Sequence, residues 1–271
     1  MTAPLLAGIL AMVAGVASSA RLVRRHPRTL VRTNHAGREV PALLGISVVG
    51  SALGAAALAT FVDLRALYPA LFLAGLALAV GMAGLADDAF ASGPRGLGGH
   101  IRSLLRGRVT TGIVKLVVVV VAAAAFAMVA GGGVVRVAAS VVLIAAATNV
   151  WNALDVRPGR ALKATLILVA VLMVPGWRGS VGVVLAACLG AAVAGLPFDL
   201  GERAMLGDAG SNPLGFMAGM GLASVLPTPG VVAAALVLLA LQAAAETVTL
   251  SRIIDAAPPL RWADRLGRKI E

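Results

Sequence analysis

Charged residues are scarce in this sequence, and their scarcity excludes an ordinary water-soluble protein. Of the 271 residues, only 13% are Asp, Glu, Lys or Arg, whereas 59% are hydrophobic, and the mean hydropathy is +0.95. Soluble domains are usually about 45–50% apolar. A chain with so few charges cannot build a large solvated surface, so we expect a polytopic protein embedded in a membrane.

Cysteine and aromatic residues are scarce as well. Cys188 is the only cysteine, which excludes an intrachain disulfide and indicates a small buried apolar residue. Aromatic residues make up only 4% of the chain, and the apolar mass is mainly Ala, Val, Leu and Gly. Small residues favour close helix packing in lipid, where van der Waals contact replaces the hydrophobic driving force.

The excess of basic residues does not indicate a nucleic-acid partner. The chain carries 23 Lys and Arg against 12 Asp and Glu, a net charge of +11, and strongly basic domains often bind nucleic acid. Here the basic residues are divided among the segments between apolar spans, without interleaved aromatic residues, so we predict no nucleic-acid partner. No Lys or Arg precedes the first apolar segment, which we expect to be a retained helix because secretory signals begin with positive charge.

Nine apolar segments have the length of a membrane span. A hydrocarbon core of about 30 Å takes about 20 helical residues, within a range of roughly 17–25. The sequence therefore predicts an all-α, polytopic helical bundle in which residues 1–271 form a single membrane-embedded domain. The expected spans are approximately residues 3–20, 40–62, 66–86, 111–131, 134–151, 161–176, 180–197, 212–227 and 230–250.

The distribution of Lys and Arg predicts the orientation of these spans. All of them except Arg65, Arg136 and Arg178 follow the first, third, fifth and seventh spans or lie in the C-terminal tail. Cytoplasmic loops carry the excess of Lys and Arg in membrane proteins, so we expect the N-terminus outside and the C-terminus in the cytoplasm. The predicted cytoplasmic loops are approximately residues 21–39, 87–112, 152–162, 198–211 and 251–271.

Three carboxylate motifs lie at the predicted cytoplasmic ends of the spans. They are Gly84-Leu85-Ala86-Asp87-Asp88, Asn149-Val150-Trp151-Asn152-Ala153-Leu154-Asp155 and Gly207-Asp208-Ala209-Gly210-Ser211. Carboxylates at membrane depth are costly and indicate function. Adjacent carboxylates at the C-terminal end of a helix also oppose its dipole, so a purely structural role is disfavoured for the first pair. Asp199, outside the motifs, is interpreted as a plain loop charge. Together the motifs predict a metal and phosphate site on one face.

In order and spacing, the three motifs resemble those of the polyprenyl-phosphate N-acetylhexosamine-1-phosphate transferase superfamily. Its members include phospho-N-acetylmuramoyl-pentapeptide transferase and the enzymes that attach GlcNAc-1-phosphate to undecaprenyl phosphate. The resemblance covers about residues 34 to 265. It implies Mg²⁺-dependent transfer of a sugar-1-phosphate, expected to be N-acetylhexosamine-1-phosphate, from a UDP-sugar to undecaprenyl or decaprenyl phosphate. UMP would be released at the cytoplasmic face of a bacterial plasma membrane, in cell-envelope glycan synthesis.

The resemblance also implies roles for the acidic residues. Asp208 would be the ligand of Mg²⁺, which prefers carboxylate, phosphate and water oxygens. Asp87 and Asp88 would lie near the lipid phosphate and position or deprotonate it, and Asp155 would complete the site. Dimerisation is common in the resembled family, so a homodimer is a further expectation.

The remaining candidate residues would bind substrate. Lys115 resembles the lysine that follows the aspartate pair in the family, and a flexible point cation suits phosphate binding; its side chain could equally extend to the membrane interface. Asn149 and Asn152 share a helix face, where they could join the site or bond across helices. Gly207, Gly210 and Ser211 permit close backbone approach and could cradle phosphate with amides at a helix start.

The chain departs from the family pattern in two places. Val156 follows Asp155 where the family has glycine, and residues 251 to 268 contain no histidine where the family has a histidine cluster. These departures favour an alternative, a non-catalytic relative that binds lipid phosphate or a nucleotide sugar as a partner or regulatory protein. A transporter ranks last, because transporter carboxylates usually lie near the bilayer midplane between repeats, and the sequence shows neither feature.

Overall fold

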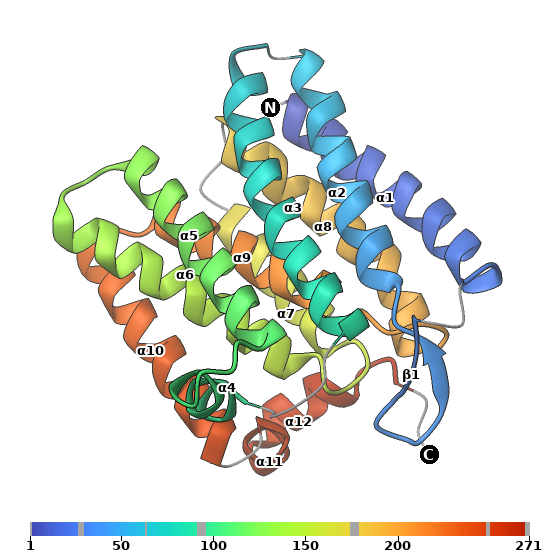
Figure 1. The fold of residues 1–271 in the computed structure, drawn as a ribbon. Coiled ribbons are helices and arrows are strands. Elements are labelled where there is room, and N and C mark those ends of the chain that lie inside the picture. Colours follow the sequence, from blue (N-terminus) through green and yellow to red (C-terminus); the bar gives the residue numbers. More distant parts are fainter. Residues whose placement is uncertain are drawn as a thin grey trace.

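The protein is a helical bundle with one small β-hairpin, as seen in a computed structural model (Figure 1). The structure describes residues 2–26, 30–62, 64–90, 96–173, 179–247 and 250–268. Nine long helices occur in these residues, and each coincides with a predicted span. They are α1 (Thr2–Arg24), α2 (Leu44–Ala59), α3 (Leu67–Phe90), α5 (Thr111–Ala130), α6 (Val134–Leu154), α7 (Arg160–Met173), α8 (Gly179–Leu200), α9 (Asp208–Val225) and α10 (Thr228–Thr247).

Seven helical segments in the described part of the chain are long and apolar enough to cross a membrane. They comprise α1, α2 with the 3₁₀ turn η2 (Thr60–Val62), α3 with the preceding turn η3 (Leu64–Ala66), α5, α6, α8 and residues Thr228–Ala245 of α10. The membrane character of the fold is thus supported, whereas α7 and α9 fall outside this set. The described part of α7 has 14 residues, and the end of its predicted span lies outside the described residues.

Large apolar side chains cover the outer helices. Leu5, Val121, Met128 and Leu236 are each more than half exposed. In a protein surrounded by water such a surface would be unfavourable, but it suits contact with lipid.

Small residues let the inner helices approach closely. A Cβ atom on Gly190 of α8 would collide with the carbonyl oxygen of Gly8 in α1, and one on Gly15 would lie 2.8 Å from the Cβ of Ala194. Most of α9 is buried, and it packs against α2, α3, α6, α7 and α8. The small residues noted in the sequence therefore allow the helix backbones to approach one another closely.

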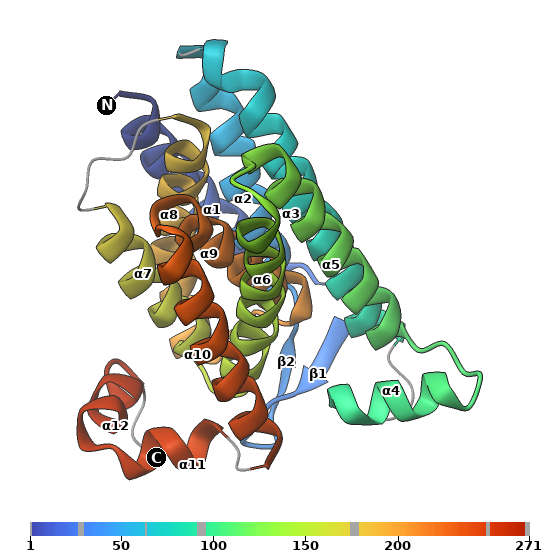
Figure 2. The same cartoon turned by 90° about the vertical axis from the view of Figure 1, so that its left-hand side faces the viewer.

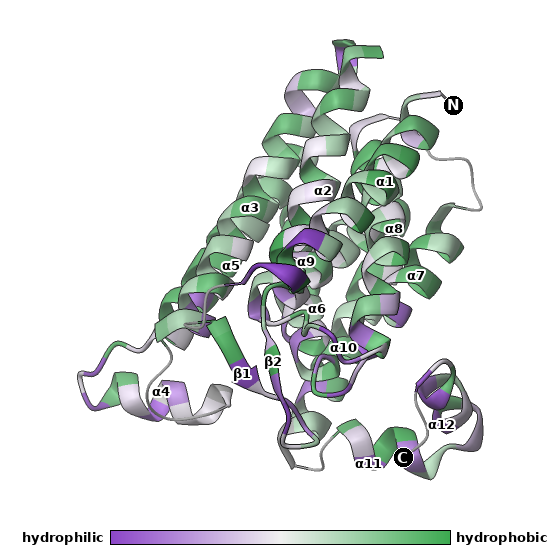
Figure 3. Cartoon of the chain, turned by 90° about the vertical axis from the view of Figure 1, so that its right-hand side faces the viewer, coloured by the Kyte–Doolittle hydropathy of each residue, from purple (hydrophilic) through white to green (hydrophobic). Residues whose placement is uncertain are grey.

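Polar elements gather at one end of the bundle (Figures 2 and 3). These are α4 (Leu97–Leu105), α11 (Leu250–Ala256), α12 (Pro258–Arg265) and an antiparallel hairpin of β1 (Val31–Thr33) and β2 (Glu39–Pro41). The hairpin departs from the all-α prediction. The Asn34 side-chain oxygen accepts the amides of Ala36 and Arg38 and so closes its turn.

The hairpin is joined to the loop before α9. The amide of Met205 donates to the carbonyl of Pro41 at 2.9 Å, and the amide of Leu44 donates back to the carbonyl of Met205 at 3.0 Å. The segment from the hairpin to the start of α2 and the distant loop before α9 are thereby fixed beside the start of α9, where the third carboxylate motif lies.

Candidate functional site

Four helix ends meet at the polar end of the bundle and bring residues of all three predicted motifs together. The C-terminal end of α3 carries Asp87, the first turns of α5 carry Thr111 and Lys115, the last turn of α6 carries Asn152, and α9 begins with Asp208. Thr110 caps α5, because its hydroxyl accepts the amide of Ile113 at 3.3 Å.

Lys115 links the first and third motifs. Its Nζ lies 2.7 Å from Oδ2 of Asp87 and also forms an ion pair with Oδ2 of Asp208. The hydroxyl of Thr111 donates to Oδ1 of Asp87 at 2.5 Å. All three charged side chains are largely covered, with 17% of Lys115, 12% of Asp87 and 22% of Asp208 exposed. Such a covered arrangement holds two carboxylates close together only because one ammonium group lies between them.

Asparagine side chains extend this cluster along α6 and α9. Nδ2 of Asn152 donates to Oδ2 of Asp208 at 3.0 Å and to Oδ1 of Asn212 at 3.1 Å. Asn212 was not predicted, although it lies one helical turn after Asp208 and its spacing could have indicated it. Nδ2 of Asn212 and the hydroxyl of Ser211 are buried without a hydrogen-bond partner among the described residues.

Asp88 differs in role from its neighbour Asp87. Its Oδ2 accepts the amide of Ala209 at 3.0 Å and therefore caps the start of α9 from a different helix. The guanidinium of Arg32, which was not predicted either, donates to the backbone carbonyl of Asp88 at 2.6 Å. Asp88 thus orients the third motif.

The glycines of the third motif mainly allow close approach. Gly207 has φ of +69°, a conformation that favours glycine, and a Cβ there would lie 2.9 Å from Oδ2 of Asp88. Gly210 lies against Gly45 of α2. The amides of Gly210 and Ser211 donate to the carbonyl of Gly207. Neither amide is therefore free in this structure to form the phosphate cradle that the sequence predicted.

The second motif is only partly joined to the cluster. Asn152 belongs to it, whereas Asn149 is exposed and its side chain has no hydrogen-bond partner among the described residues. Asp155 lies just after α6. Burial, followed by the nearby charges of Asp199 and Asp208, raises the pKa of Asp155 well above its ordinary value, although a hydrogen bond from Gly207 opposes the shift.

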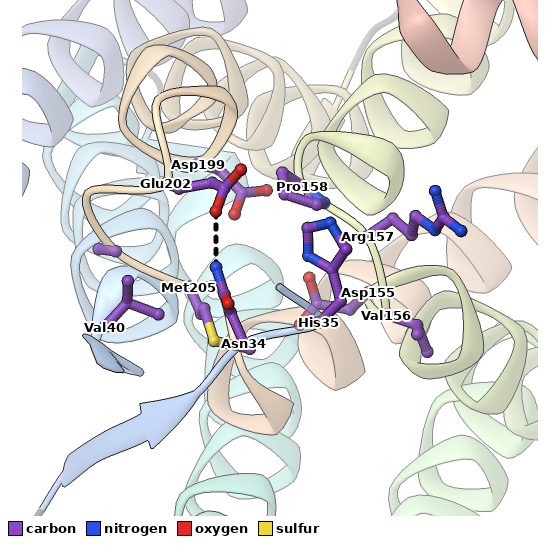
Figure 4. A pocket seen from close by; sticks show the side chains of 11 residues that line it. Asn34, His35, Val40, Asp155, Val156, Arg157, Pro158, Asp199, Glu202 and Met205 are labelled. Atoms are coloured by element: carbon purple, nitrogen blue, oxygen red, sulfur yellow. Dashed lines mark hydrogen bonds between the residues drawn. The ribbon is translucent and has the colours of Figure 1, made fainter. Parts of the chain in front are cut away.

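A small cavity lies beside Asp155 (Figure 4). It measures about 20 Å³, enough for roughly one water molecule. Asn34 and Glu202 face one another at its edge, where the Asn34 amide donates to Glu202 at 2.6 Å. Asp199 also lines it. The interpretation of Asp199 as a loop charge was wrong, because this residue lies in α8, is 4% exposed and accepts the amide of Gly159 at 2.7 Å.

The donor set of the cluster fits one mode of magnesium binding. No group of three or more His, Cys, Asp or Glu side chains suited to a metal occurs among the described residues. Magnesium, however, usually takes one or two protein carboxylates and completes its shell with water and substrate phosphates. Asp87 and Asp208, with the amide oxygen of Asn212 nearby, are the groups of the cluster that such a site would use.

No protein-family model matches the chain, and no curated protein matches it either. The function is therefore inferred from the residues of the site and their arrangement.

Proposed function

We propose that this protein is a membrane-embedded phosphosugar transferase that resembles the polyprenyl-phosphate N-acetylhexosamine-1-phosphate transferases. It would transfer a sugar-1-phosphate from a UDP-sugar to a polyprenyl phosphate and release UMP. The observation that carries the proposal is the contact of Lys115 with both Asp87 and Asp208, because it brings two separate sequence motifs into one charged cluster at the bundle end.

The reaction needs groups that bring two phosphates together. An oxygen of the lipid phosphate attacks the phosphorus that carries the sugar, a new P–O bond forms, and the P–O bond to UMP breaks. Phosphoryl transfer of this kind depends mainly on positioning and on charge stabilisation. Mg²⁺ held by Asp208, and by Asp87 in addition to the role near the lipid phosphate that the resemblance implies, would neutralise the pyrophosphate and the charge developing on UMP.

The other side chains would orient these groups. The hydroxyl of Thr111 fixes one oxygen of Asp87, and the amide of Asn152 fixes one oxygen of Asp208. The ammonium of Lys115 supplies a mobile positive charge for an incoming phosphate. Asp155, just after α6, lies near Asp208 and would help to complete the site.

The proposed topology places this cluster at the cytoplasmic face. Seven segments are candidate spans, and α7 and α9 would complete the nine predicted ones. The basic residues concentrated near the site support the orientation by the positive-inside rule. The lipid would enter sideways between helices, and the nucleotide sugar would arrive from the cytoplasm.

An assay of nucleotide release tests the proposal. Purified protein in nanodiscs would receive undecaprenyl phosphate, Mg²⁺ and, in turn, each member of a panel of UDP-sugars, and UMP would be measured. Asp208→Asn should abolish release, while Asp255→Asn, a carboxylate removed from outside the cluster, should not. Equal release from Asp208→Asn and wild type would refute the proposed site.

A non-catalytic relative is the second candidate. It is favoured by Val156 after Asp155, by the absence of histidine in residues 251 to 268, and by the small size of the cavity near Asp155. Such a protein would bind undecaprenyl phosphate or a UDP-sugar without releasing UMP. Isothermal titration with each ligand, run beside the release assay, separates the two candidates.

A further inference from the structure

Lys115 lies where a divalent cation would be expected to bind. Its ammonium contacts Oδ2 of Asp87 and Oδ2 of Asp208, the two carboxylates that best suit magnesium in the cluster. These oxygens cannot hold a metal and the ammonium in the same arrangement, because two cations between them would repel each other. The amide of Asn152 also donates to the Asp208 oxygen, so that oxygen is already shared.

We propose that Lys115 is a resident counter-cation that a divalent metal displaces, so that its ammonium moves from the carboxylates to the phosphates of the nucleotide sugar. This role rests on the proposed function. Before substrate binds, the lysine neutralises part of the charge of Asp87 and Asp208 and keeps the metal affinity low. When metal and pyrophosphate arrive together, the metal takes the carboxylates and the lysine gains a phosphate partner. Metal and nucleotide binding are thereby coupled through one side chain.

Metal binding without turnover tests this exchange. Purified wild type, Lys115→Met and Arg25→Gln would be titrated with Mn²⁺ and followed by electron paramagnetic resonance. Lys115→Met should bind Mn²⁺ about tenfold more tightly, because a unit charge next to the metal is removed. Arg25→Gln removes an exposed positive charge just after α1, outside the cluster, and should bind like wild type. Equal or weaker binding by Lys115→Met would overturn the proposal.

Thermal stability gives an independent readout. Without the lysine, Asp87 and Asp208 repel each other, so Lys115→Met should melt at a lower temperature in EDTA than wild type. Mg²⁺ should restore most of that loss, since it stabilises the folded form that binds it. Failure of Mg²⁺ to raise the melting temperature more than in wild type, or failure to fold even with Mg²⁺, would contradict the exchange.

These results are separable from the fate of the proposed function. UMP release by wild type together with unchanged Mn²⁺ binding in Lys115→Met would retain the transferase and reject the exchange. Tighter Mn²⁺ binding in the variant without UMP release from wild type would retain the exchange as a property of the cluster and reject the transferase.

A second inference concerns α4, which projects sideways from the polar end of the bundle (Figures 2 and 3). His100 attaches it to α5, because its Nδ1 lies 2.9 Å from Oγ1 of Thr110 and its ring lies against Gly112. The other side of α4 and the following loop expose 82% of Leu105 and 70% of Val109. Three arginines are exposed beside these side chains: Arg102, Arg106 and Arg108.

We infer that α4 lies on the membrane surface and prefers acidic phospholipid. The combination of exposed Leu104 and Leu105 with a set of arginines is typical of helices that lie in the lipid interface. The candidate spans that contain α3 and α5 precede and follow α4 in the chain, and they keep this helix near the bilayer. Arginines near an anionic headgroup layer add a favourable charge interaction. This inference does not depend on the proposed transferase activity.

Site-directed spin labelling tests the inference. The only cysteine, Cys188, is buried, so Leu105→Cys and Ser103→Cys each offer one accessible thiol on opposite sides of α4. In nanodiscs that contain phosphatidylglycerol, the label at 105 should be better shielded from a water-soluble nickel relaxant than the label at 103. Neutralising the three arginines to glutamine should reduce that shielding.

Two outcomes would overturn the inference. Equal access of nickel to both labels would show that α4 does not lie on the bilayer. Equal shielding of the label at 105 in nanodiscs of phosphatidylcholine alone and in nanodiscs that also contain phosphatidylglycerol would show that α4 has no preference for acidic lipid.

Discussion

Oδ2 of Asp88 accepts the backbone amide of Ala209 at 3.0 Å, so the end of α3 caps the start of α9. The residue at the cap position of α9 is Gly207, which has no side chain to perform this role. A carboxylate at the start of a helix is favourable because it faces the positive end of the helix dipole. The charge of Asp88 is unfavourable at the C-terminal end of α3, but the start of the neighbouring helix α9 stabilises it.

The capping role predicts that Asp88 tolerates asparagine better than alanine. Asp88→Asn keeps an oxygen that can accept the Ala209 amide, whereas Asp88→Ala loses the cap, a change that costs about 1 kcal/mol in other helices. The melting temperature in detergent should therefore fall in Asp88→Ala and stay near wild type in Asp88→Asn. Equal losses in the two variants would argue that the charge of Asp88, rather than its cap, is required.

Thr111 is predicted to orient Asp87 for the proposed reaction. Its hydroxyl donates to Oδ1 of Asp87 at 2.5 Å. Thr111→Val removes the donor at nearly constant volume, and UMP release should fall about tenfold, as expected for the loss of one hydrogen bond to a charged group. Thr111→Ser keeps the hydroxyl and should retain most of the activity. The same loss in serine and valine variants would show that the methyl group, not the hydroxyl, matters.

Close packing of α1 against α8 is predicted to depend on Gly190. A Cβ there would collide with the carbonyl oxygen of Gly8, so Gly190→Ala should separate the two helices and lower the melting temperature. Gly50→Ala is the matched control, because a Cβ at Gly50 meets nothing within 4 Å. Alanine suits a helix interior better than glycine by roughly 0.5–1 kcal/mol. The control should therefore be neutral or stabilising, and a similar loss in both variants would contradict the packing argument.

The C-terminal helices are predicted to be held by a buried ion pair. The guanidinium of Arg160, at the start of α7, donates to both oxygens of Asp264 in α12 at 2.8 and 3.0 Å. Removing one partner of such a pair costs about 3–5 kcal/mol in other proteins, because the other charge stays buried. Asp264→Asn should therefore speed hydrogen exchange of residues 250–268 while the core helices keep their protection.

The same ion pair predicts a pH dependence. Burial opposes the charge of Asp264, but the hydrogen bond and charge of Arg160, with the charges of Arg268 and Lys163, lower its pKa below the ordinary value. A lowered carboxyl pKa stabilises the folded form above the ordinary aspartate pKa, and this stabilisation is lost as pH falls through the lowered pKa. Hydrogen exchange of 250–268 should rise in that acidic range for wild type. In Asp264→Asn, hydrogen exchange of residues 250–268 should already be fast at neutral pH. If these residues of the variant stayed protected at neutral pH, the Arg160–Asp264 pair would not be the main contact that holds the C-terminal helices.

The sequence by itself determined the helices and their small-residue packing. In the described residues each of the nine apolar segments is mainly helical, and seven helical segments are long and apolar enough to be candidate spans. A helix suits a segment in lipid because it satisfies its backbone hydrogen bonds internally. The positions of the carboxylate motifs at helix ends followed from the same segments. Asn152 and Lys115 were predicted as site residues from the resemblance of their neighbours to a family pattern, and the structure places both beside Asp208.

Only the tertiary structure decided which of these side chains meet. Lys115 and Asp208 are far apart in the chain, and no local rule pairs them. The separate roles of Asp87 and Asp88 depend on which helix lies beside each of two adjacent residues. The burial of Asp199, interpreted from sequence as a loop charge, depends on the packing around α8. The periodicity of the sequence predicts where each helix forms. It does not predict how closely two distant helices approach or how each is rotated, and these decide which side chains meet.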